Sequence, residues 1–379
     1  MQTIGILGGG QLGKMLALAA ANRDLPIWSL DKSSDFPAGP FSTKFVEGDF
    51  KNYDDVYNFG KQVDILTIEI EHVNTDALLQ LEKEGVKIHP SPAALNIIKD
   101  KGLQKQFYRD NDLPTSDFTF YEGAEAIRAA VKNGDLPLPF VQKSRGGGYD
   151  GKGVAVIKTQ ADLAEKLLPV PSITEPLVDI DKELAVVAAR NEDGEIKTFP
   201  TVEMEFNQVA NLVEFLVCPA AVSAEIEKRA TELAVKTIAA YDLCGLLAVE
   251  LFLTKSGEIL INEVAPRPHN SGHHTIDSCY TSQFQQHLRA VQNYPLGDTT
   301  MKTPSVMVNL LGADGYTGEA HYAGMPEVMA LRGVNLHLYG KKVTKPFRKM
   351  GHATVTAEST EEAKKIAKLV QERLVIRTK

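Results

Sequence analysis

Short apolar runs alternate with amphipathic segments over the first 100 residues. The apolar runs predict strands, and they lie at residues 4–7, 26–30, 63–68 and 86–89. The first two are separated by a segment whose apolar residues share one face of a predicted helix over residues 11–22. Asn74 and Ser91 occupy N-cap positions of further helices. Strands that alternate with helices form parallel sheets, so a Rossmann-like domain is predicted over residues 1–100.

The pattern changes beyond residue 100, where pairs of strands follow one another. Residues 136–141 and 154–157 predict two strands that flank a glycine-rich tip. A second hairpin is predicted from residues 246–253 and 259–262, after a long amphipathic helix over residues 223–242. Further strands are predicted on both sides of residues 179–181 and near residues 305–310, 334–339 and 351–356, and a last helix over residues 360–373. The second part of the chain is therefore expected to differ in architecture from the first.

Composition is that of an ordinary globular protein. The 379 residues suggest two to three domains, and a net charge of −8 gives no support for nucleic-acid binding. The three cysteines match no zinc-binding spacing and fit a reducing compartment. No apolar run reaches the roughly 18 residues of a membrane span, and the first residues lack the features of a signal peptide. A cytoplasmic protein with neither a nucleic-acid nor a membrane partner is expected.

A first glycine motif follows the first predicted strand. Gly8, Gly10 and Gly13 fit the GxGxxG pattern, and Asp31 ends the next strand. This context is typical of dinucleotide binding, because glycine lets the backbone approach a phosphate at a helix start. The same loop also suits another phosphorylated ligand, or merely tight packing of strand and helix. An NAD-dependent oxidoreductase is therefore one hypothesis.

A second glycine-rich segment spans residues 143–153. Lys143 and Lys152 could contact a polyphosphate beneath a loop that becomes ordered when nucleotide binds. The segment is not a Walker A loop, because Gly153 follows Lys152 where serine or threonine is required. A mobile solvated hairpin is the alternative interpretation.

Two glutamates lie in apolar surroundings on the predicted second hairpin. Glu250 and Glu263 would repel each other across the hairpin unless a cation lies between them. Their hard oxygen atoms suit magnesium together with nucleotide phosphates. The alternative is that one of them faces solvent or pairs with a lysine.

Polar and basic segments follow this hairpin. Residues 267–274, Arg-Pro-His-Asn-Ser-Gly-His-His, are rich in groups that bind anions and predict an active-site loop. Zinc binding by the two final histidines is discounted, because no second ligand cluster is present. Basic residues at 341–349 form either a solvated face or a phosphate clamp.

Six segments together resemble the ATP-grasp superfamily and, within it, the 5-(carboxyamino)imidazole ribonucleotide synthase family of purine biosynthesis. They are GGGQLGKML at 8–16, TIEIEHV at 67–73, KSRGGGYDGKG at 143–153, INEVAPRPHNSGHHT at 261–275, PSVMVNLLG at 304–312 and FRKMGHATV at 347–355. The resemblance implies an α/β protein with an ATP-grasp fold, an N-terminal Rossmann-like (pre-ATP-grasp) parallel-sheet domain and a small C-terminal α+β extension. The expected divisions are the N-terminal domain at 1–100, a lid and linker subdomain at 101–178, and a central subdomain with a C-terminal substrate-phosphate-binding part at 179–379.

The reaction that the resemblance implies joins bicarbonate to the exocyclic amine of 5-aminoimidazole ribonucleotide. ATP phosphorylates bicarbonate to carboxyphosphate, which releases CO2 for capture by the amine and leaves ADP and phosphate. Magnesium is the implied metal, a homodimer the implied assembly, and a separate mutase the implied recipient of the product. Three alternatives stay open: a formate-dependent ATP-grasp enzyme acting on glycinamide ribonucleotide, the oxidoreductase and a non-catalytic nucleotide-binding regulator.

The resemblance also implies roles for individual residues. The ATP-binding set is Lys101, Lys143, Gly148, Tyr149, Asp150, Gly151, Lys152, Gly153, Glu175, Pro176, Leu177, Val178, Glu183, Asn262 and Glu263. The metal set is Glu250 and Glu263. The set facing the ribonucleotide is Gln11, Leu12, Glu69, Tyr149, Asp150, Lys341, Arg348 and Lys349. The catalytic bicarbonate or CO2 set is Arg267, His269, Asn270 and Ser271.

Two positions depart from the family pattern. Lys101 stands where relatives often carry arginine. Phe206 stands where relatives commonly carry a histidine near ATP, and it offers no hydrogen-bonding group. Phe206 is therefore left out of the expected nucleotide site.

Overall fold

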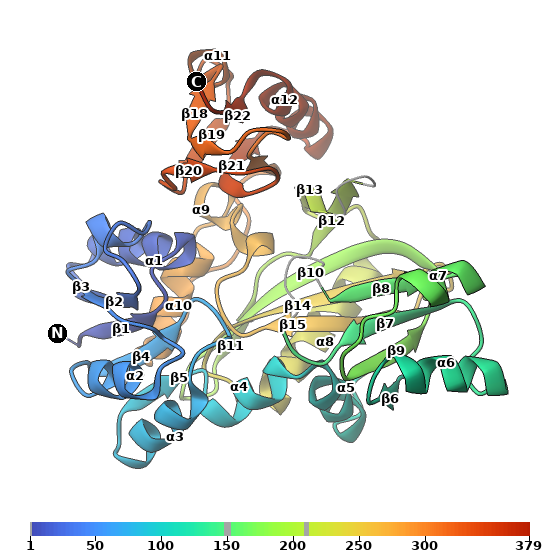
Figure 1. Ribbon diagram of the computed structural model, residues 1–379. Coiled ribbons are helices and arrows are strands. Elements are labelled where there is room, and N and C mark those ends of the chain that lie inside the picture. Colours follow the sequence, from blue (N-terminus) through green and yellow to red (C-terminus); the bar gives the residue numbers. More distant parts are fainter. Residues whose placement is uncertain (1, 148–152, 208–211) are drawn as a thin grey trace.

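The first sheet is parallel and has five strands in the order β3-β2-β1-β4-β5. The computed structural model describes residues 2–147, 153–207 and 212–379 (Figure 1). The strands of this sheet are β1 (Ile4–Leu7), β2 (Ile27–Asp31), β3 (Lys44–Glu47), β4 (Ile65–Ile68) and β5 (Lys87–His89). Its helices are α1 (Gln11–Ala21), α2 (Tyr53–Gly60), α3 (Thr75–Lys83) and α4 (Pro92–Lys99). The predicted Rossmann-like domain is confirmed, including the caps by Asn74 and Ser91, whereas β3 and α2 were not predicted.

A second sheet is antiparallel and has the order β6-β9-β7-β8. Its strands are β6 (Thr119–Tyr121), β7 (Phe140–Ser144), β8 (Val154–Ile157) and β9 (Ser172–Pro176). The accompanying helices are α5 (Lys101–Asp110), α6 (Ala124–Asn133) and α7 (Gln160–Glu165). β7 pairs with β8 in the predicted hairpin arrangement, and a small apolar core around Phe140 holds the layer together.

The largest sheet has nine strands and runs β15-β14-β10-β12-β13-β16-β21-β19, with β11 paired to β10. The strands are β10 (Ile180–Arg190), β11 (Ile196–Thr198), β12 (Val202–Asn207), β13 (Leu212–Cys218), β14 (Gly245–Thr254), β15 (Ile259–Ala265), β16 (Ser305–Leu311), β19 (Val334–Leu338) and β21 (Lys349–Thr356). β13 pairs with β16, so the strands of the C-terminal extension continue the central sheet. The extension is therefore joined to the central part by backbone hydrogen bonds.

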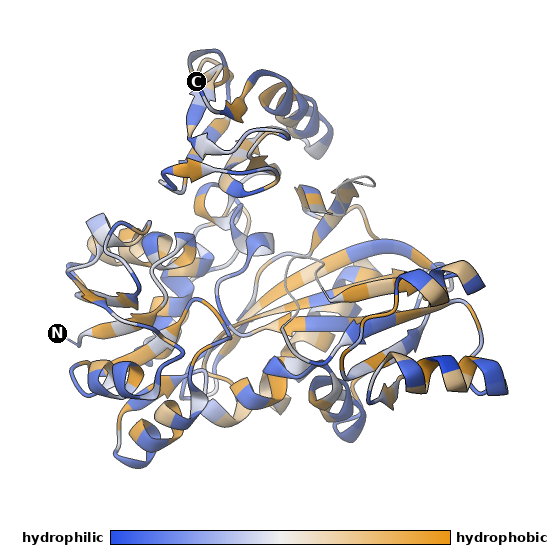
Figure 2. Ribbon diagram, in the orientation of Figure 1, coloured by the Kyte–Doolittle hydropathy of each residue, from blue (hydrophilic) through white to orange (hydrophobic). Residues whose placement is uncertain are grey.

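The remaining elements cover these sheets. They are η1 (Gly39–Phe41), α8 (Ala224–Ala240), η2 (Asn270–Gly272), α9 (Thr275–Ser278), α10 (Gln283–Val291), β17 (Gly318–Glu319), β18 (His321–Ala323), α11 (Met325–Met329), β20 (Val343–Thr344), α12 (Thr360–Arg373) and β22 (Val375–Arg377). The predicted last helix is present as α12, and the Ser359 side chain caps it by accepting from the Glu362 N–H. Helices such as α6 and α12 carry hydrophilic and hydrophobic residues side by side, as amphipathic helices do (Figure 2). None of the helices in the described part of the chain is long and apolar enough to cross a lipid bilayer.

Helix α10 joins the N-terminal domain to the central sheet. Phe284 and Leu288 of this helix lie in the same apolar core as Ile4 and Leu16 of the first domain. His287 of α10 and Thr67 of β4 are joined by a buried hydrogen bond of 2.9 Å. In the structure, the parallel sheet, the β6-β9-β7-β8 sheet and the C-terminal elements lie on three sides of β14 and β15 (Figure 1).

Candidate active site

Glu250 and Glu263 face each other across the β14–β15 pair, where they are direct register partners. Burial raises the pKa of Glu250, and Lys101 is the group that counters this effect most. The Lys101 ammonium also forms an ion pair with Glu263. The sequence offered a cation site or a lysine partner as alternatives, and in the structure a lysine pairs with one of the two carboxylates.

A buried cluster of charges lies beside this pair. The Glu175 carboxylate lies 3.1 Å from the Lys143 ammonium and 3.2 Å from that of Lys105. Lys143 also donates to the Asn262 side chain at 2.9 Å. Burial opposes ionisation of Glu175, but the two ammonium groups outweigh it and lower its pKa. Three predicted ATP residues are thus in direct contact, and Lys105 is an addition to them.

Lys101 begins α5 next to the base of the glycine-rich loop. Its backbone N–H donates to the Arg145 carbonyl at 2.8 Å, and Arg145 forms an ion pair with Asp100. Burial and the neighbouring Lys143 ammonium lower the pKa of Lys101 to about 8. The lysine is therefore poised near a concentration of positive charge that a polyphosphate would neutralise.

Residues 175–178, which belong to the expected ATP-binding set, lie where β9 ends and the chain continues to β10. Pro176 and Leu177 are exposed and Val178 is partly exposed, while the Glu175 side chain is buried. Glu183 follows on β10, where burial and the Glu250 charge raise its pKa to about 7. A carboxyl group that is half protonated near neutrality can both donate to and accept from a hydroxyl group.

The polar loop after β15 contacts one carboxylate of the N-terminal domain, Glu71, and one of the carboxylate pair, Glu250. The Arg267 Nε donates to Glu71 at 2.7 Å, and the His269 Nε2 lies 3.4 Å from Glu250. The His269 Nδ1 also lies 2.9 Å from the Ser271 hydroxyl and caps η2. The loop therefore links the N-terminal domain to the carboxylate pair. The structure thus gives Arg267 an ion pair and His269 a cap on η2, and an ion pair or a cap alone does not assign catalysis.

The loop is fixed to the C-terminal extension as well. Asn270 and Asn309 exchange two side-chain hydrogen bonds, of 3.0 and 3.1 Å. Asn309 also donates to the Val213 carbonyl. The Asn270 amide is thereby hydrogen-bonded to Asn309 of β16. The Ser271 side chain is buried and contacts His269.

The first glycine motif holds a carboxylate of the protein itself. Glu69 accepts hydrogen bonds from the N–H groups of Gly10 and Gly13, and Asp31 accepts from that of Gly9. A Cβ atom added to Gly8 would lie 2.2 Å from the Glu69 side chain. The position at the helix start where a dinucleotide would place its pyrophosphate is therefore filled, which argues against the oxidoreductase hypothesis.

The predicted ribonucleotide residues lie on neighbouring elements. Lys14 of α1 donates to the Leu338 carbonyl at 2.8 Å, so the start of α1 lies beside the end of β19. The Lys341 ammonium donates to the Lys349 carbonyl, and the Arg348 guanidinium to that of Val343. Burial raises the pKa of Glu250, and the positive charge of Lys349 is one of the effects that oppose this rise. Lys349 is therefore close enough to the carboxylate pair to act on it.

Two residues at the start of α1 differ in exposure. Gln11 is partly exposed at the first helical position, whereas the Leu12 side chain is buried in the core of the first domain. Leu12 would thus face a ligand through its backbone.

Sequence comparison gives matches over most of the chain. The ribonucleotide synthetase pre-ATP-grasp domain matches residues 1–99, the ATP-grasp domain residues 106–284, and the phosphoribosylaminoimidazole carboxylase C-terminal domain residues 305–366. The N5-carboxyaminoimidazole ribonucleotide synthase of Bacillus subtilis is 38% identical, with 95% of this chain and 92% of that protein covered. The chain belongs to this ATP-dependent ligase family.

Longer relatives and solved structures agree with this assignment. The chloroplastic phosphoribosylaminoimidazole carboxylase of Vigna aconitifolia is 39% identical over 94% of this chain, which spans only 64% of that protein. The N5-carboxyaminoimidazole ribonucleotide synthetase of Thermotoga maritima has a TM-score of 0.92 and 41% identity, with both chains fully covered. The Aspergillus clavatus synthase in complex with ADP and 5-aminoimidazole ribonucleotide has a TM-score of 0.89 and 33% identity, with 98% of each chain covered.

Part of the expected site of this synthase family member lies outside the described residues. These are Gly148, Tyr149, Asp150, Gly151 and Lys152. Gly153 is described; its φ is +88°, and its carbonyl accepts from the Ser144 N–H at 2.8 Å. The positive φ explains the glycine at the end of the loop.

Three residues with contacts in the site were missed by the sequence reasoning. Lys105 is buried against Glu175, Glu71 pairs with Arg267, and Gln283 binds the backbone of His269. A lysine four positions after Lys101 on one helix was the only available signal for Lys105. The other two act across long separations in sequence, which no local pattern reveals.

Buried histidines make the stability of the protein sensitive to acid. Burial lowers the pKa of His274 to about 4 and that of His287 to about 3, and it lowers the pKa of His273 and His352 well below the ordinary value. These groups stay neutral in the folded state, whereas in the unfolded chain they take up protons below pH 6.5. Their contribution to stability is thus present above that pH and is lost as the pH falls toward the folded-state values.

We expect His274 and His287 each to remove about 2 kcal/mol from the unfolding free energy between pH 7 and pH 5. Urea unfolding followed at the two pH values measures this loss. A His287→Asn variant should lose less on acidification than the unchanged protein. Equal losses in the two proteins would contradict the assignment.

Proposed function

We propose that this chain carboxylates 5-aminoimidazole ribonucleotide with bicarbonate at the expense of ATP. The observation that carries the proposal is the contact of 3.4 Å between His269 and Glu250, because it brings the polar loop to the carboxylate pair. Residues suited to bind phosphate and residues suited to bind a small anion therefore meet at one place. ADP, phosphate and the carbamate of the ribonucleotide are the products.

Magnesium is the metal that we propose for Glu250 and Glu263. The two carboxylates are register partners on rigid strands, and magnesium takes hard oxygen ligands from one or two carboxylates together with substrate phosphates. Among residues 2–147, 153–207 and 212–379 no group of three or more histidine, cysteine, aspartate or glutamate residues that could hold a metal ion occurs. The bound ion would neutralise phosphate charge during transfer.

On the nucleotide side, Lys101 and Lys143 would contact phosphate oxygens. Residues 175–178 would bind adenine through backbone groups, and Glu183 would hold the ribose hydroxyls; its pKa of about 7 supports that role. Asn262 keeps Lys143 oriented by accepting its hydrogen bond. Gly153 and the residues before it would close over the phosphates.

The chemical steps need positioning and charge neutralisation more than covalent catalysis. A bicarbonate oxygen attacks the γ-phosphorus of ATP, and the bond to the ADP oxygen breaks. Carboxyphosphate then loses phosphate, and the amine nitrogen attacks the carbon of the released CO2 and gives up a proton. Arg267 would stabilise the anionic intermediate through its planar fork, and His269 would hold CO2 or move the proton, with Asn270 and Ser271 completing the pocket.

On the ribonucleotide side, we assign Gln11, Leu12 and Glu69 to the aminoimidazole part, together with Tyr149 and Asp150. Lys341, Arg348 and Lys349 would bind the phosphate. The adjacency of α1 and β19 supports a site between them. We extend the proposal to the divisions at 1–100, 101–178 and 179–379, a cytoplasmic homodimer and delivery of the product to a separate mutase, all of which rest on the family relation.

A phosphate-release assay with single omissions tests the function. Release should require ATP, magnesium, bicarbonate and 5-aminoimidazole ribonucleotide together. Release that needs formate and glycinamide ribonucleotide instead would replace the proposal by the formyl-transfer alternative. Nucleotide binding without any turnover would favour the regulator.

A further inference from the structure

Gln283, the first residue of α10, is fully buried and binds the backbone of one loop residue twice. Its Oε1 accepts from the His269 N–H at 2.9 Å, and its Nε2 donates to the His269 carbonyl at 2.8 Å. This is the pattern by which one strand binds another, supplied here by a side chain. It fixes His269 in an extended conformation, with φ −127° and ψ 156°.

The His269 backbone fixes the orientation of the same amide. The reverse orientation would place Oε1 against the His269 carbonyl and Nε2 against the His269 N–H, where neither pair can form a hydrogen bond. In the orientation that fits, the Gln283 Nε2 has a second hydrogen, and it lies 2.9 Å from the His273 Nδ1. That hydrogen can be donated to the neutral His273 ring when Nδ1 is unprotonated.

His273 is packed among other rings. Its ring centroid lies 4.7 Å from that of His352, which is stacked at 4.5 Å on His337. The Phe284 ring centroid lies 5.7 Å from it. A buried imidazole among other imidazoles resists protonation, so His273 keeps one ring nitrogen that can accept a hydrogen bond.

The loop is shaped to receive this amide. A Cβ atom added to Gly272 would lie 2.4 Å from the Gln283 Oε1, so a larger residue there would displace the Gln283 amide. The Thr275 hydroxyl accepts from the Gln283 backbone N–H at 2.8 Å and donates to the Gly272 carbonyl at 2.6 Å. The contacts between the loop and the start of α10 therefore form one connected set.

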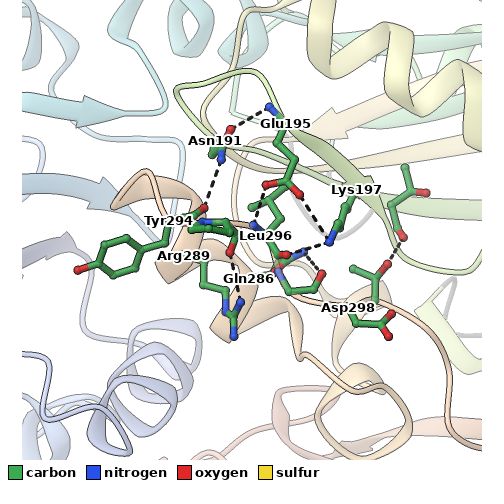
Figure 3. Close-up of polar contacts among 12 residues, drawn as sticks. Asn191, Glu195, Lys197, Gln286, Arg289, Tyr294, Leu296 and Asp298 are labelled. Carbon is green, nitrogen blue, oxygen red and sulfur yellow. Dashed lines mark hydrogen bonds and ion pairs between the residues drawn. The ribbon is translucent and has the colours of Figure 1, made fainter.

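Residues further along α10 are anchored separately (Figure 3). The Gln286 amide binds the N–H and carbonyl of Gly297 at 2.8 and 3.1 Å, and the neighbouring Leu296 N–H donates to Glu195 at 2.9 Å. Arg289 donates to the Pro295 carbonyl. The helix is thus held at Gln286 and Arg289 by contacts that do not involve Gln283.

We propose that Gln283 is a positioning residue for carboxylation, which holds the His269 backbone where the His269 ring lies against Glu250. The proposal rests on the function proposed above. The His269 Nε2 lies 3.4 Å from Glu250 in the backbone position that Gln283 fixes, and a misplacement of about 1 Å at a reacting group can cost roughly 10²-fold in rate. His269 touches the reacting groups, and Gln283 acts through it.

The test compares Gln283→Glu with Gln286→Glu. Both glutamines are fully buried on the same helix and bind one backbone residue twice, so both substitutions put an acceptor where an amide donated. We expect Gln283→Glu to lower kcat for bicarbonate-dependent phosphate release by about 10²-fold, with the KM for ATP changed less than about 3-fold. Gln286→Glu should lower the unfolding midpoint about as much as Gln283→Glu does, but it should leave kcat unchanged.

A second variant and a second measurement protect the test from misfolding and from failure of the proposed function. Gln283→Met keeps the side-chain length without a charge and should show the same loss of kcat. Hydrogen exchange should show lost protection at His269 in Gln283→Met, which offers no acceptor to the His269 N–H, and not in Gln286→Glu, whatever reaction the protein performs. Unchanged kcat in the Gln283 variants, equal loss in Gln286→Glu, or intact protection at His269 in Gln283→Met would each overturn the proposal. Absence of bicarbonate-dependent release in the unchanged protein would instead overturn the proposed function.

Discussion

Glu250→Gln and Glu263→Gln are each expected to abolish ATP turnover in a protein that still folds. The two carboxylates are register partners, and burial raises the pKa of Glu250, so a neutral side chain at position 250 relieves repulsion. The unfolding temperature of Glu250→Gln should therefore stay the same or rise, whereas Glu263→Gln also gives up the ion pair with Lys101. Turnover should fall by at least about 10³-fold, because half of the proposed cation site is lost while the phosphate charge remains.

Glu258→Gln is the matched control for this prediction. Glu258 is exposed at the turn of the same β14–β15 hairpin and contacts Ser256 through its side chain. It should keep full phosphate release. Titration of magnesium for each variant gives a second measure, since a weakened site should need more metal. Near-normal turnover of either site variant at ordinary magnesium would contradict the assignment.

Arg267→Lys and His269→Asn are expected to leave ligand binding intact while bicarbonate-dependent phosphate release falls by about 10²-fold or more. Lysine at position 267 keeps the charge and can still pair with Glu71, but it loses the planar fork. Asparagine at position 269 loses the ring nitrogen that lies toward Glu250. Interactions made only in the transition state would be lost, whereas ground-state binding would be kept.

Calorimetry with ATP and with ribonucleotide, beside the phosphate-release assay, measures both quantities. Arg229→Lys provides the control, because Arg229 is exposed on α8 and donates to the Gly257 carbonyl at the β14–β15 turn. Glu71→Gln separates the ion pair from catalysis, because it removes the pair that Arg267→Lys keeps. If the pair alone mattered, Glu71→Gln would lower the rate and Arg267→Lys would not. Full activity in both loop variants, or a loss of ATP binding equal to the loss of rate, would refute the assignment.

The sequence predicted those features that depend on local pattern. The N-terminal alternation of apolar runs and helical faces led to the parallel sheet, and the facing positions of Glu250 and Glu263 followed from two short strands joined by a turn. Both are properties of near neighbours in the chain. The strands β3 and β6 were missed, because each is short and carries exposed or partly exposed residues that leave no apolar run.

The contacts that sequence could not reveal join residues far apart in the chain. Glu69 and Glu71 lie two residues apart in one string, yet one accepts from Gly10 and the other pairs with Arg267. The glycine motif alone is compatible with a phosphate ligand at the start of α1. It does not show that the Glu69 carboxylate of the chain itself occupies this position. Partners so far apart in sequence are fixed only by the packing of the finished sheets.

The continuity of the largest sheet has a consequence for synthesis on the ribosome. β13 (Leu212–Cys218) is complete as a strand long before β16 (Ser305–Leu311) emerges to pair with it. Until then its outer N–H and C=O groups form an open edge, the kind of surface that recruits strands from other chains. A product interrupted before residue 305 would consequently be a template for aggregation rather than a smaller enzyme.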